Sequence, residues 1–280
     1  MNGIISFVGA GPGAPDLLTL RGAARLARAE IVIWPSSLVP QAVLSHASPG
    51  ATVIDSATMT LEDVIEVYSN NPGARIVRLA SGDPTIYGAL QEQIDWCVAR
   101  QRDFEIVPGV SSFTAAAALC ERELTQPGIS QSIVLTRLPG RTAASVPAGE
   151  SLERFAAAGS TMAIFLAGAR PAELVERLLA PDSAFTPATP AAVVAYVTWE
   201  GREKLVVTDI SGIETAVAGI GTSTTVLVLV GDFMRDGAGR SRLYAPDFNH
   251  KYRYRSASPS TKGRPSAAAK RRPDRLPRSE

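Results

Sequence analysis

Residues 4–19 read IISFVGAGPGAPDLLT, an apolar run that leads into a glycine-rich turn. Apolar runs without polar alternation are typical of strands buried on both faces of a sheet. Glycine lets the backbone approach a ligand closely, so this turn is a candidate ligand loop. A plain tight turn would explain the same glycines, and this stretch alone does not separate the two interpretations.

The turn also fits the GxGxxA form of a dinucleotide-binding fingerprint, with Ala14 as its last position. Pro12 and Pro15 argue against NAD, because they lack the amide donors that a pyrophosphate needs. The next apolar run, 31–34, ends in Pro-Ser where an acid that binds the ribose is expected. The loop therefore favours a ligand without phosphates, and a nicotinamide-dependent dehydrogenase remains the weaker alternative.

The same pattern of apolar run, glycine and helical segment recurs along the chain, which predicts an α/β fold with largely parallel or mixed sheets. Further strands are expected at 75–80, 104–107, 161–167 and 225–230. Helices are expected at 20–29, 88–100, 115–122 and 171–179. Thr19 is the expected N-cap of the first helix, and Pro171 suits the first turn of the last.

Two of these strands are followed by polar motifs with two interpretations each. Gly-Asp-Pro at 82–84 can place amides and a carboxylate at the sheet edge where α/β proteins bind ligands, or it can cap a helix that begins near Gly88. Ser111 and Ser112 can bond a ligand or cap the next helix, and capping is the commoner use of such serines.

The 280 residues suit one large domain or two ordinary ones. The polar stretch ERELTQPGIS at 121–130 predicts a boundary, so we expect α/β domains at 1–122 and 131–255. Residues 256–280 are rich in Ser, Pro, Ala and Arg, which predicts a disordered tail.

Charge is distributed unevenly between the body and this tail. The chain has 28 Lys and Arg and 27 Asp and Glu, of which the tail holds seven basic and two acidic residues. The body is left with 21 basic and 25 acidic side chains, which argues against nucleic acid as its main partner. A binding module whose basic tail docks acidic partners is the non-enzymatic alternative.

Composition excludes several other classes. With 45% hydrophobic and 20% charged residues, the chain can form a substantial core. Two histidines exclude a His-rich metal site, and Cys97 and Cys120 form no CxxC pair, so we expect no metal and a reducing cytoplasm. No apolar run reaches the roughly 18 residues of a membrane span, and the first residues do not resemble a signal peptide.

Three motifs, taken together and in order, resemble the tetrapyrrole (corrin/porphyrin) methylases, which use S-adenosylmethionine. They are GAGPGAPDLLTLRGA (9–23), SGDPTIYGA (81–89) and VPGVSSFTAAAA (107–118). The resemblance covers about residues 4–255. Softer stretches are similar to the branch of the family whose substrate is precorrin-4, methylated at C11; they are WPSSLVP (34–40), QSIVLTR (131–137), GRT (140–142) and YAPDFNHKYR (244–253).

The resemblance implies a homodimer of two α/β domains that bind the cofactor in the cleft between them. The cofactor-binding positions that it carries over are Pro12, Ser81, Gly82, Asp83, Ile86, Ser111, Ser112, Leu166, Ala195, Tyr196 and Val197. Leu166 stands where relatives have methionine, which keeps an apolar wall for the adenine. Other members of the family, which act on uroporphyrinogen-III, on precorrin-3 or in diphthamide formation, remain alternatives.

Precorrins carry many carboxylates, so basic side chains are expected around the substrate, and arginine matches carboxylates bidentately. The candidates are Arg137, Arg141, His250, Lys251 and Arg253, although solvated surface charge explains each of them equally well. A methyl group on a sulfonium is already activated, so the protein needs mainly to align the reactants and exclude water. No residue is predicted as a catalytic base.

Overall fold

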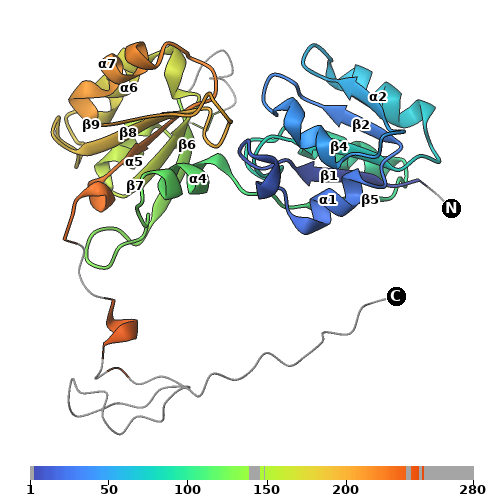
Figure 1. Cartoon of the computed structure of the whole chain (residues 1–280). Coiled ribbons are helices and arrows are strands. Elements are labelled where there is room, and N and C mark those ends of the chain that lie inside the picture. The colour runs from blue at the N-terminus through green and yellow to red at the C-terminus, as the bar shows by residue number, and fades with distance from the viewer. Residues whose placement is uncertain (1–2, 139–145, 148, 238–240, 246–247, 249–280) are drawn as a thin grey trace, which may run out of the picture. The chain divides into compact units, whose positions relative to one another are not determined.

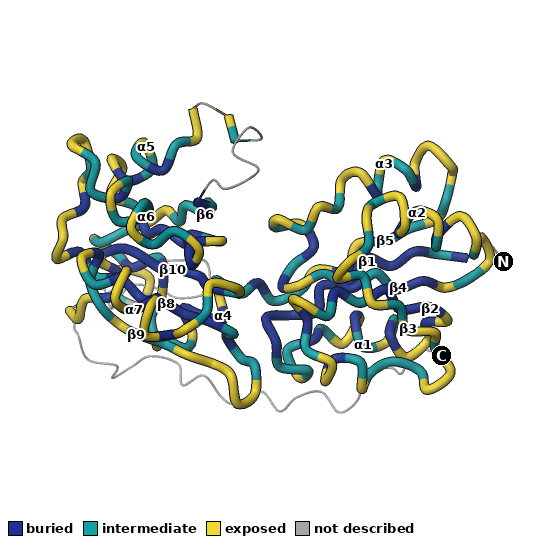
Figure 2. Tube along the Cα trace, turned by 90° about the horizontal axis from the view of Figure 1, so that it is seen from above, coloured by how far each residue is buried: buried dark blue, intermediate teal, exposed yellow. Residues whose placement is uncertain are grey.

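The computed structural model describes residues 3–138, 146–147, 149–237, 241–245 and 248. Residues 1–238 form one compact unit that holds two five-stranded sheets, and residues 239–280 form a second unit. Figure 2 shows that the deepest burial follows the central strands of both sheets. The predicted division at residues 122 and 131 stays a prediction.

The first sheet is entirely parallel, as the apolar runs predicted, with strand order β3-β2-β4-β1-β5 (Figure 1). Its strands are β1 (Ile5–Gly9), β2 (Ile31–Trp34), β3 (Thr52–Asp55), β4 (Ile76–Ala80) and β5 (Phe104–Val107). Alternate residues of β1, β2 and β4 enter two cores, because both faces of the sheet are covered by helices. The helices are α1 (Leu20–Leu26), α2 (Leu61–Asn70) and α3 (Gln91–Ala99).

The chain leaves β1 and β4 toward opposite faces of this sheet. Leu26 of α1 packs in one core with Val8 and Leu79, whereas Cys97 of α3 packs in the other core with Phe7 and Ile76. The loops after β1 and β4 therefore diverge at the carboxyl edge of two neighbouring strands. Such a divergence is the topological switch point at which open α/β sheets bind ligands.

The second sheet is mostly antiparallel, with order β6-β7-β10-β8-β9 and a single parallel pair, β6 with β7. Its strands are β6 (Ile133–Arg137), β7 (Thr161–Phe165), β8 (Pro190–Ala195), β9 (Lys204–Asp209) and β10 (Val226–Val230). This sheet is of the mixed kind that the sequence pattern allowed, since β7 is parallel to β6 and antiparallel to β10. A strand buried on both faces has the same apolar composition whether its neighbour runs parallel or antiparallel to it.

Helices α5 (Leu152–Ala157), α6 (Pro171–Leu178) and α7 (Ile213–Ile220) share one core with this second sheet. The opposite face is covered by α4 (Ser112–Leu119), whose buried residues Ala115, Ala116 and Ala117 pack against the second sheet although α4 directly follows β5. The chain thus passes from one sheet to the other before α4, ahead of the predicted boundary segment. Six 3₁₀ segments complete the described elements: η1 (Pro15–Leu17), η2 (Gln41–His46), η4 (Ala167–Ala169), η5 (Ile210–Gly212), η6 (Asp232–Met234) and η7 (Arg242–Tyr244).

Local signals located four helices, α1, α3, α4 and α6, but not all of their ends, and α2, α5 and α7 were not predicted. The Thr19 hydroxyl accepts a hydrogen bond from the Gly22 amide and caps α1, and Pro171 occupies the first turn of α6. Helix α3 begins at Gln91 rather than Gly88, because Tyr87 and Ala89 have φ values of 55° and 45°. Left-handed backbone interrupts a right-handed helix.

One ion pair ties α1 to the edge strand of the first sheet. The Arg25 guanidinium donates to both carboxylate oxygens of Glu105, and the Ser6 hydroxyl donates to the same carboxylate at 2.7 Å. The hydrogen bond from Arg25 is the main reason that the pKa of Glu105 lies below its ordinary value. Arg25 therefore does more than lie on a solvated helix face.

We expect Glu105→Gln to lower the free energy of unfolding by up to about 1 kcal/mol at pH 7, the usual size for a pair near the surface. A carboxyl whose pKa is lowered by folding stabilises the fold above its unfolded pKa, and this contribution disappears as pH falls through the folded pKa. In urea unfolding, the difference between the parent and the variant should thus shrink as pH falls through the lowered pKa of Glu105. Glu66→Gln on α2 is the control, and an equal pH dependence in both variants would contradict the assignment.

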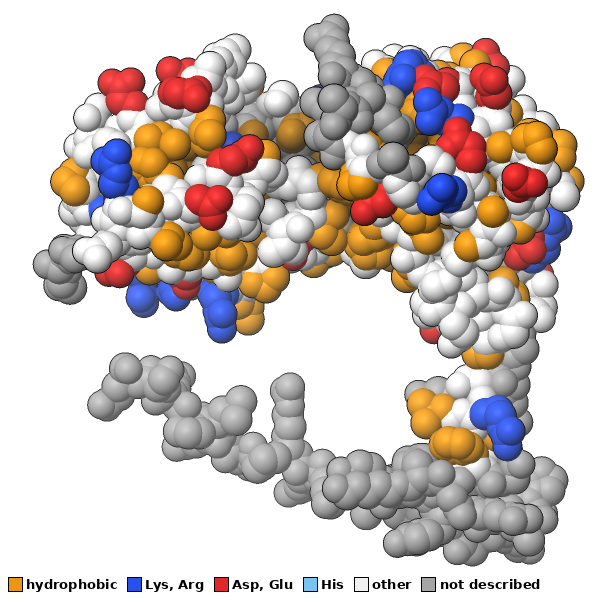
Figure 3. Space-filling view, turned by 180° about the vertical axis from the view of Figure 1, so that it is seen from behind, with side chains coloured by type: hydrophobic (Ala, Val, Ile, Leu, Met, Phe, Trp, Pro, Cys, Tyr) orange, Lys and Arg blue, Asp and Glu red, His pale blue; other side chains and the backbone are white. Residues whose placement is uncertain are grey.

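Figure 3 shows acidic and basic side chains interspersed on one face, with apolar side chains between them. That face lacks the continuous basic stripe typical of nucleic-acid binding. No helix within the described residues is long and apolar enough to cross a membrane.

Candidate active site at the sheet edge

The three sequence motifs meet at the carboxyl edge of β4, β1 and β5, which are neighbours in the first sheet. The first two loops pair through their backbones: the Gly82 amide donates to the Gly11 carbonyl at 2.8 Å, and the Gly11 amide donates to the Gly82 carbonyl at 3.2 Å. Both glycines have positive φ, 76° at Gly11 and 64° at Gly82, a conformation that favours glycine. The first two loops therefore form one backbone platform.

The third loop fits onto this platform only because its contact residue has no side chain. A Cβ on Gly109 would lie 2.1 Å from the Gly82 carbonyl oxygen and 2.8 Å from the Gly9 Cα. A Cβ on Gly9 would in turn lie 2.6 Å from the Gly109 Cα. Gly9 and Gly109 therefore allow the backbones of two loops to come into contact. A plain tight turn, the other interpretation of the glycines in the first loop, would not require this contact.

The Asp83 carboxylate holds the second and third loops together. Its Oδ1 accepts hydrogen bonds from the Thr85 amide at 2.8 Å and the Thr85 hydroxyl at 2.6 Å, and its Oδ2 accepts from the Gly109 amide at 3.0 Å. Burial raises the pKa of Asp83, but the hydrogen bonds from Thr85 and Gly109 together outweigh it, so the pKa lies below its ordinary value. The motif therefore forms an Asx turn but does not cap the next helix, because α3 begins at Gln91 with Leu90 as its N-cap; ligand binding by Gly-Asp-Pro stays a prediction.

A cavity of about 350 Å³ opens beside these loops, within the range of small-molecule sites. Nine of the eleven residues predicted to bind the cofactor line it: Pro12, Ser81, Gly82, Ile86, Ser111, Ser112, Leu166, Tyr196 and Val197. Asp83 and Ala195 lie outside the lining; the Asp83 carboxylate is used within the loops, and Ala195 is fully buried in the second sheet.

Nine further residues line the cavity, and none of them is among the predicted cofactor-binding positions. Leu38 and Tyr87 belong to loops of the first sheet, and the opposite wall comes from the second sheet and its loops, with Phe165, Trp199, Ser223, Thr224, Thr225, Val226 and Leu227. The Trp199 indole donates to the Pro12 carbonyl at 3.1 Å, and the Thr198 hydroxyl accepts from the Ala14 amide at 2.9 Å. The turn after β8 is therefore fastened to the first glycine loop. A lone tryptophan in a polar turn gave no signal of this role.

Backbone strain concentrates around the cavity. Tyr87, Leu166, Tyr196 and Thr225, all in the lining, have φ values between 50° and 56°. Non-glycine residues in this region cost roughly 1–3 kcal/mol each and persist where surrounding structure enforces them, often at ligand sites. Such conformations follow from long-range packing, so residue type does not reveal them.

Residues 5–214 match the profile of a family described as tetrapyrrole (corrin/porphyrin) methylases, which spans three quarters of the chain. The chain belongs to this family. It is 39% identical over 252 residues to a cobalt-precorrin-4 C(11)-methyltransferase of Methanocaldococcus jannaschii, covering 89% of this chain and 95% of the relative. It is 37% identical over 251 residues to a precorrin-4 C(11)-methyltransferase of Mycobacterium tuberculosis, covering 89% and 98%.

The methylase also resembles a solved structure, that of a cobalt precorrin-4 methyltransferase described as a cobalamin biosynthetic enzyme. The TM-score is 0.78 at 35% identity, and the match covers 83% of this chain and 96% of that chain. The predicted α/β fold class, with one parallel and one mixed sheet, is confirmed.

The polar end of the methylase cavity lies at the start of α4. Ser111 is the N-cap residue, yet its side chain makes no capping hydrogen bond, so the commoner capping role predicted for these serines does not apply to its hydroxyl. Ser111 is buried and lines the cavity together with Ser112. Hydroxyls and unsatisfied amides at a helix start suit a carboxylate.

Another part of the methylase cavity lining combines aromatic and aliphatic side chains with the hydroxyls of Tyr196 and Thr224. The Tyr196 hydroxyl bonds the Thr224 hydroxyl at 3.0 Å, and the Tyr196 and Trp199 rings meet edge to face at 5.3 Å. Leu166 is 65% exposed and lines the same cavity. A flat heterocycle fits such a wall, so the cavity suits a ligand that joins an aromatic base to an amino-acid group.

One of the predicted substrate residues is described. Arg137 ends β6 and pairs in register with Phe165, a lining residue of the cavity. Arg141, His250, Lys251 and Arg253 lie outside the described residues. Within the described residues, no group of three or more His, Cys, Asp or Glu side chains could hold a metal ion.

Proposed function

We propose that this chain is an S-adenosylmethionine-dependent C-methyltransferase of cobalamin biosynthesis, which methylates precorrin-4 at C11 to give precorrin-5. The observation that carries this proposal is the match to relatives named for this reaction over 95% and 98% of their own length. The cavity at the switch point of the first sheet supports it independently of the names.

S-adenosylmethionine supplies a methyl group that a sulfonium has already activated. We assign its amino-acid end to Ser111, Ser112 and the start of α4, and its base to the wall formed by Leu166, Tyr196 and Val197. Pro12, Ser81, Gly82 and Ile86 would line the path between these ends, and Asp83 would act on the site by positioning Gly109.

The described lining has no Asp, Glu, His, Lys or Arg side chain. The hydroxyl of Tyr87 donates to the Leu135 carbonyl at 3.2 Å, and that of Tyr196 bonds Thr224. Such a cavity supports alignment and exclusion of water rather than acid–base catalysis. The nucleophilic carbon would come from the enamine character of the macrocycle itself.

Substrate carboxylates would need basic partners, and the sequence offers Arg137, Arg141, His250, Lys251 and Arg253 as candidates. A homodimeric assembly and a cytoplasmic location remain predictions from the sequence. The names of the two relatives differ in cobalt, so the proposal covers both precorrin-4 and cobalt-precorrin-4.

Calorimetric titration tests the cofactor half of this proposal. We expect S-adenosylhomocysteine to bind the purified chain with a micromolar Kd and NAD to give no heat, because the loop has prolines where a pyrophosphate needs amides. Binding of NAD alone would favour the alternative that the chain is a nicotinamide-dependent dehydrogenase. If neither ligand gives a heat of binding, the result would favour the non-enzymatic alternative, a binding module.

Methyl transfer to enzymatically prepared precursors tests the substrate half. We expect turnover of precorrin-4 or cobalt-precorrin-4 and none of uroporphyrinogen-III, with C11 as the methylated carbon by mass spectrometry and carbon-13 NMR. Turnover of uroporphyrinogen-III alone would keep the family and reject the proposed substrate.

A further inference from the structure

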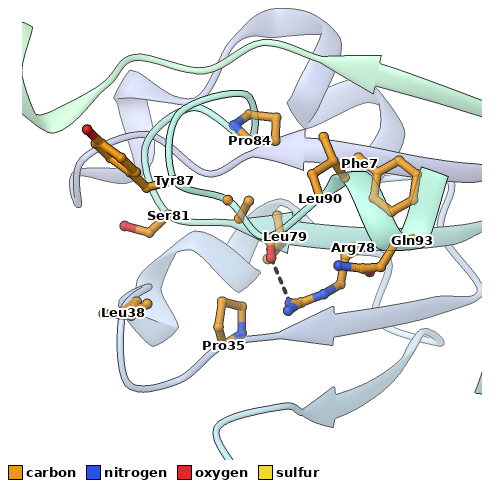
Figure 4. A pocket seen from close by; sticks show the side chains of 12 residues that line it. Phe7, Pro35, Leu38, Arg78, Leu79, Ser81, Pro84, Tyr87, Leu90 and Gln93 are labelled. Carbon is orange, nitrogen blue, oxygen red and sulfur yellow. Dashed lines mark hydrogen bonds between the residues drawn. The ribbon is translucent and has the colours of Figure 1, made fainter. Parts of the chain in front are cut away.

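A second, smaller cavity of about 110 Å³ adjoins the main one and shares Leu38, Ser81 and Tyr87 with it. Figure 4 shows its interior, with the Arg78 side chain reaching from β4 toward Pro35 at the end of β2. This volume is below the roughly 150 Å³ of a cavity that binds benzene, so the space suits a small group such as a carboxylate better than a macrocycle. The nature of Arg78 therefore decides what the cavity can bind.

Arg78 is a partly buried cation without a countercharge among the described residues. Its Nη1 donates to the Ser56 hydroxyl at 3.2 Å. The same Nη1 donates to the Leu79 carbonyl at 2.8 Å, as Figure 4 shows. Its Nε is buried without a hydrogen-bond partner, and no described carboxylate lies within ion-pair distance. Arg25, by contrast, pairs with Glu105.

The neighbours of Arg78 do not compensate its charge. The nearby Gln93 is neutral and bonds elsewhere, since its Oε1 accepts from the Tyr68 hydroxyl at 2.7 Å and its Nε2 donates to the Ala89 carbonyl at 3.0 Å. Burial lowers the pKa of Arg78, which shows that the charged form is disfavoured in the protein alone. A buried charge is retained at such a cost mainly where an opposite charge can join it.

We propose that the cavity beside Arg78 receives a carboxylate of a ligand bound in the main cavity. The identity of the ligand rests on the proposed function, which offers two sources: a carboxylate arm of the tetrapyrrole, or the amino-acid carboxylate of the methyl donor. The tetrapyrrole arm is favoured, because Ser111, Ser112 and the start of α4 already provide for the donor. Arg78 would thus fix the orientation of the macrocycle relative to the methyl group.

Binding measurements on the full chain test this site with three probes: uroporphyrin, S-adenosylhomocysteine, and 5′-methylthioadenosine, which lacks the amino-acid carboxylate. We expect Arg78→Met to weaken the binding of uroporphyrin about tenfold or more, because a charge-assisted contact is lost. The affinities for the other two probes should stay within about twofold of those of the parent. Arg78→Lys keeps the charge and should fall between. Arg75→Met, at the opposite end of β4, is the control and should bind all three like the parent.

The outcomes separate the two carboxylate sources and the two proposals. If the Arg78 variants bind S-adenosylhomocysteine more weakly but bind 5′-methylthioadenosine like the parent, the cavity receives the donor carboxylate. That result still supports a carboxylate site. Unchanged binding of all probes, or equal loss of all three together with a lower Tm in both Arg78 variants, overturns the site. Methyl transfer by the parent chain is scored separately, so that a failure of the proposed reaction is not confused with a failure of the Arg78 site.

Discussion

Gly109→Ala is expected to abolish measurable binding of S-adenosylhomocysteine, with a loss of about a hundredfold or more, equivalent to roughly 3 kcal/mol. The added Cβ would lie 2.1 Å from the Gly82 carbonyl oxygen and 2.8 Å from the Gly9 Cα. Both obstacles are backbone atoms of the paired loops, so no side chain can rotate away. Relief requires the third loop to leave the platform, which moves Ser111 and Ser112 out of the cavity wall.

Calorimetry with S-adenosylhomocysteine and a thermal unfolding curve measure this effect. Overpacking of this kind also destabilises folds, typically by about 1–3 kcal/mol, so we expect a lower Tm as well. Gly50→Ala is the control, because a Cβ there meets no atom within 4 Å. A Gly109→Ala protein that binds the ligand within threefold of the parent would refute the interlocked-loop account.

Asp83→Asn is expected to weaken the binding of S-adenosylhomocysteine by about ten- to a hundredfold, although Asp83 does not line the cavity. The carboxylate accepts three hydrogen bonds, from the Thr85 amide, the Thr85 hydroxyl and the Gly109 amide. An asparagine amide nitrogen cannot accept, so at least one of these donors would face another donor. The second and third loops would separate as a result.

The pH dependence of S-adenosylhomocysteine binding provides a second test of this role of Asp83. Because the pKa of Asp83 lies below its ordinary value, its contribution is complete above the ordinary aspartate pKa of about 3.9 and disappears as pH falls through the lowered value. The affinity of the parent should therefore drop below pH 4, while that of Asp83→Asn is flat there. Asp95→Asn on α3 is the control, and a variant that binds like the parent at pH 7 would contradict the positioning role.

The sequence identified the ligand edge because the signals involved are local. Apolar runs without alternation marked β1, β4 and β5, and the glycines after them marked the points where backbone had to come close. Parallel strands place their carboxyl ends at the same edge, so three motifs far apart in the sequence could be expected to meet. The motifs could not show which loops would touch, since that depends on strand order.

Other features depended on contacts between distant segments. The antiparallel pairing of β7 with β10 left no trace in their composition, because burial on both faces selects the same residues in either direction. Helix α4 packs on the second sheet, because its alanines find their apolar partners there rather than on the sheet that precedes it in the chain.

The sequence by itself indicated the strands and loops that form the ligand edge of the first sheet and, through the family resemblance, nine residues of the cavity lining. Only the tertiary structure decided the wall formed by Trp199 and Thr225, the role of Asp83 between two loops, and the charge that Arg78 leaves uncompensated. The physical reason is one of range. Propensity, capping and glycine conformation act over a few residues, whereas a cavity and its electrostatics arise where segments more than a hundred residues apart come into contact.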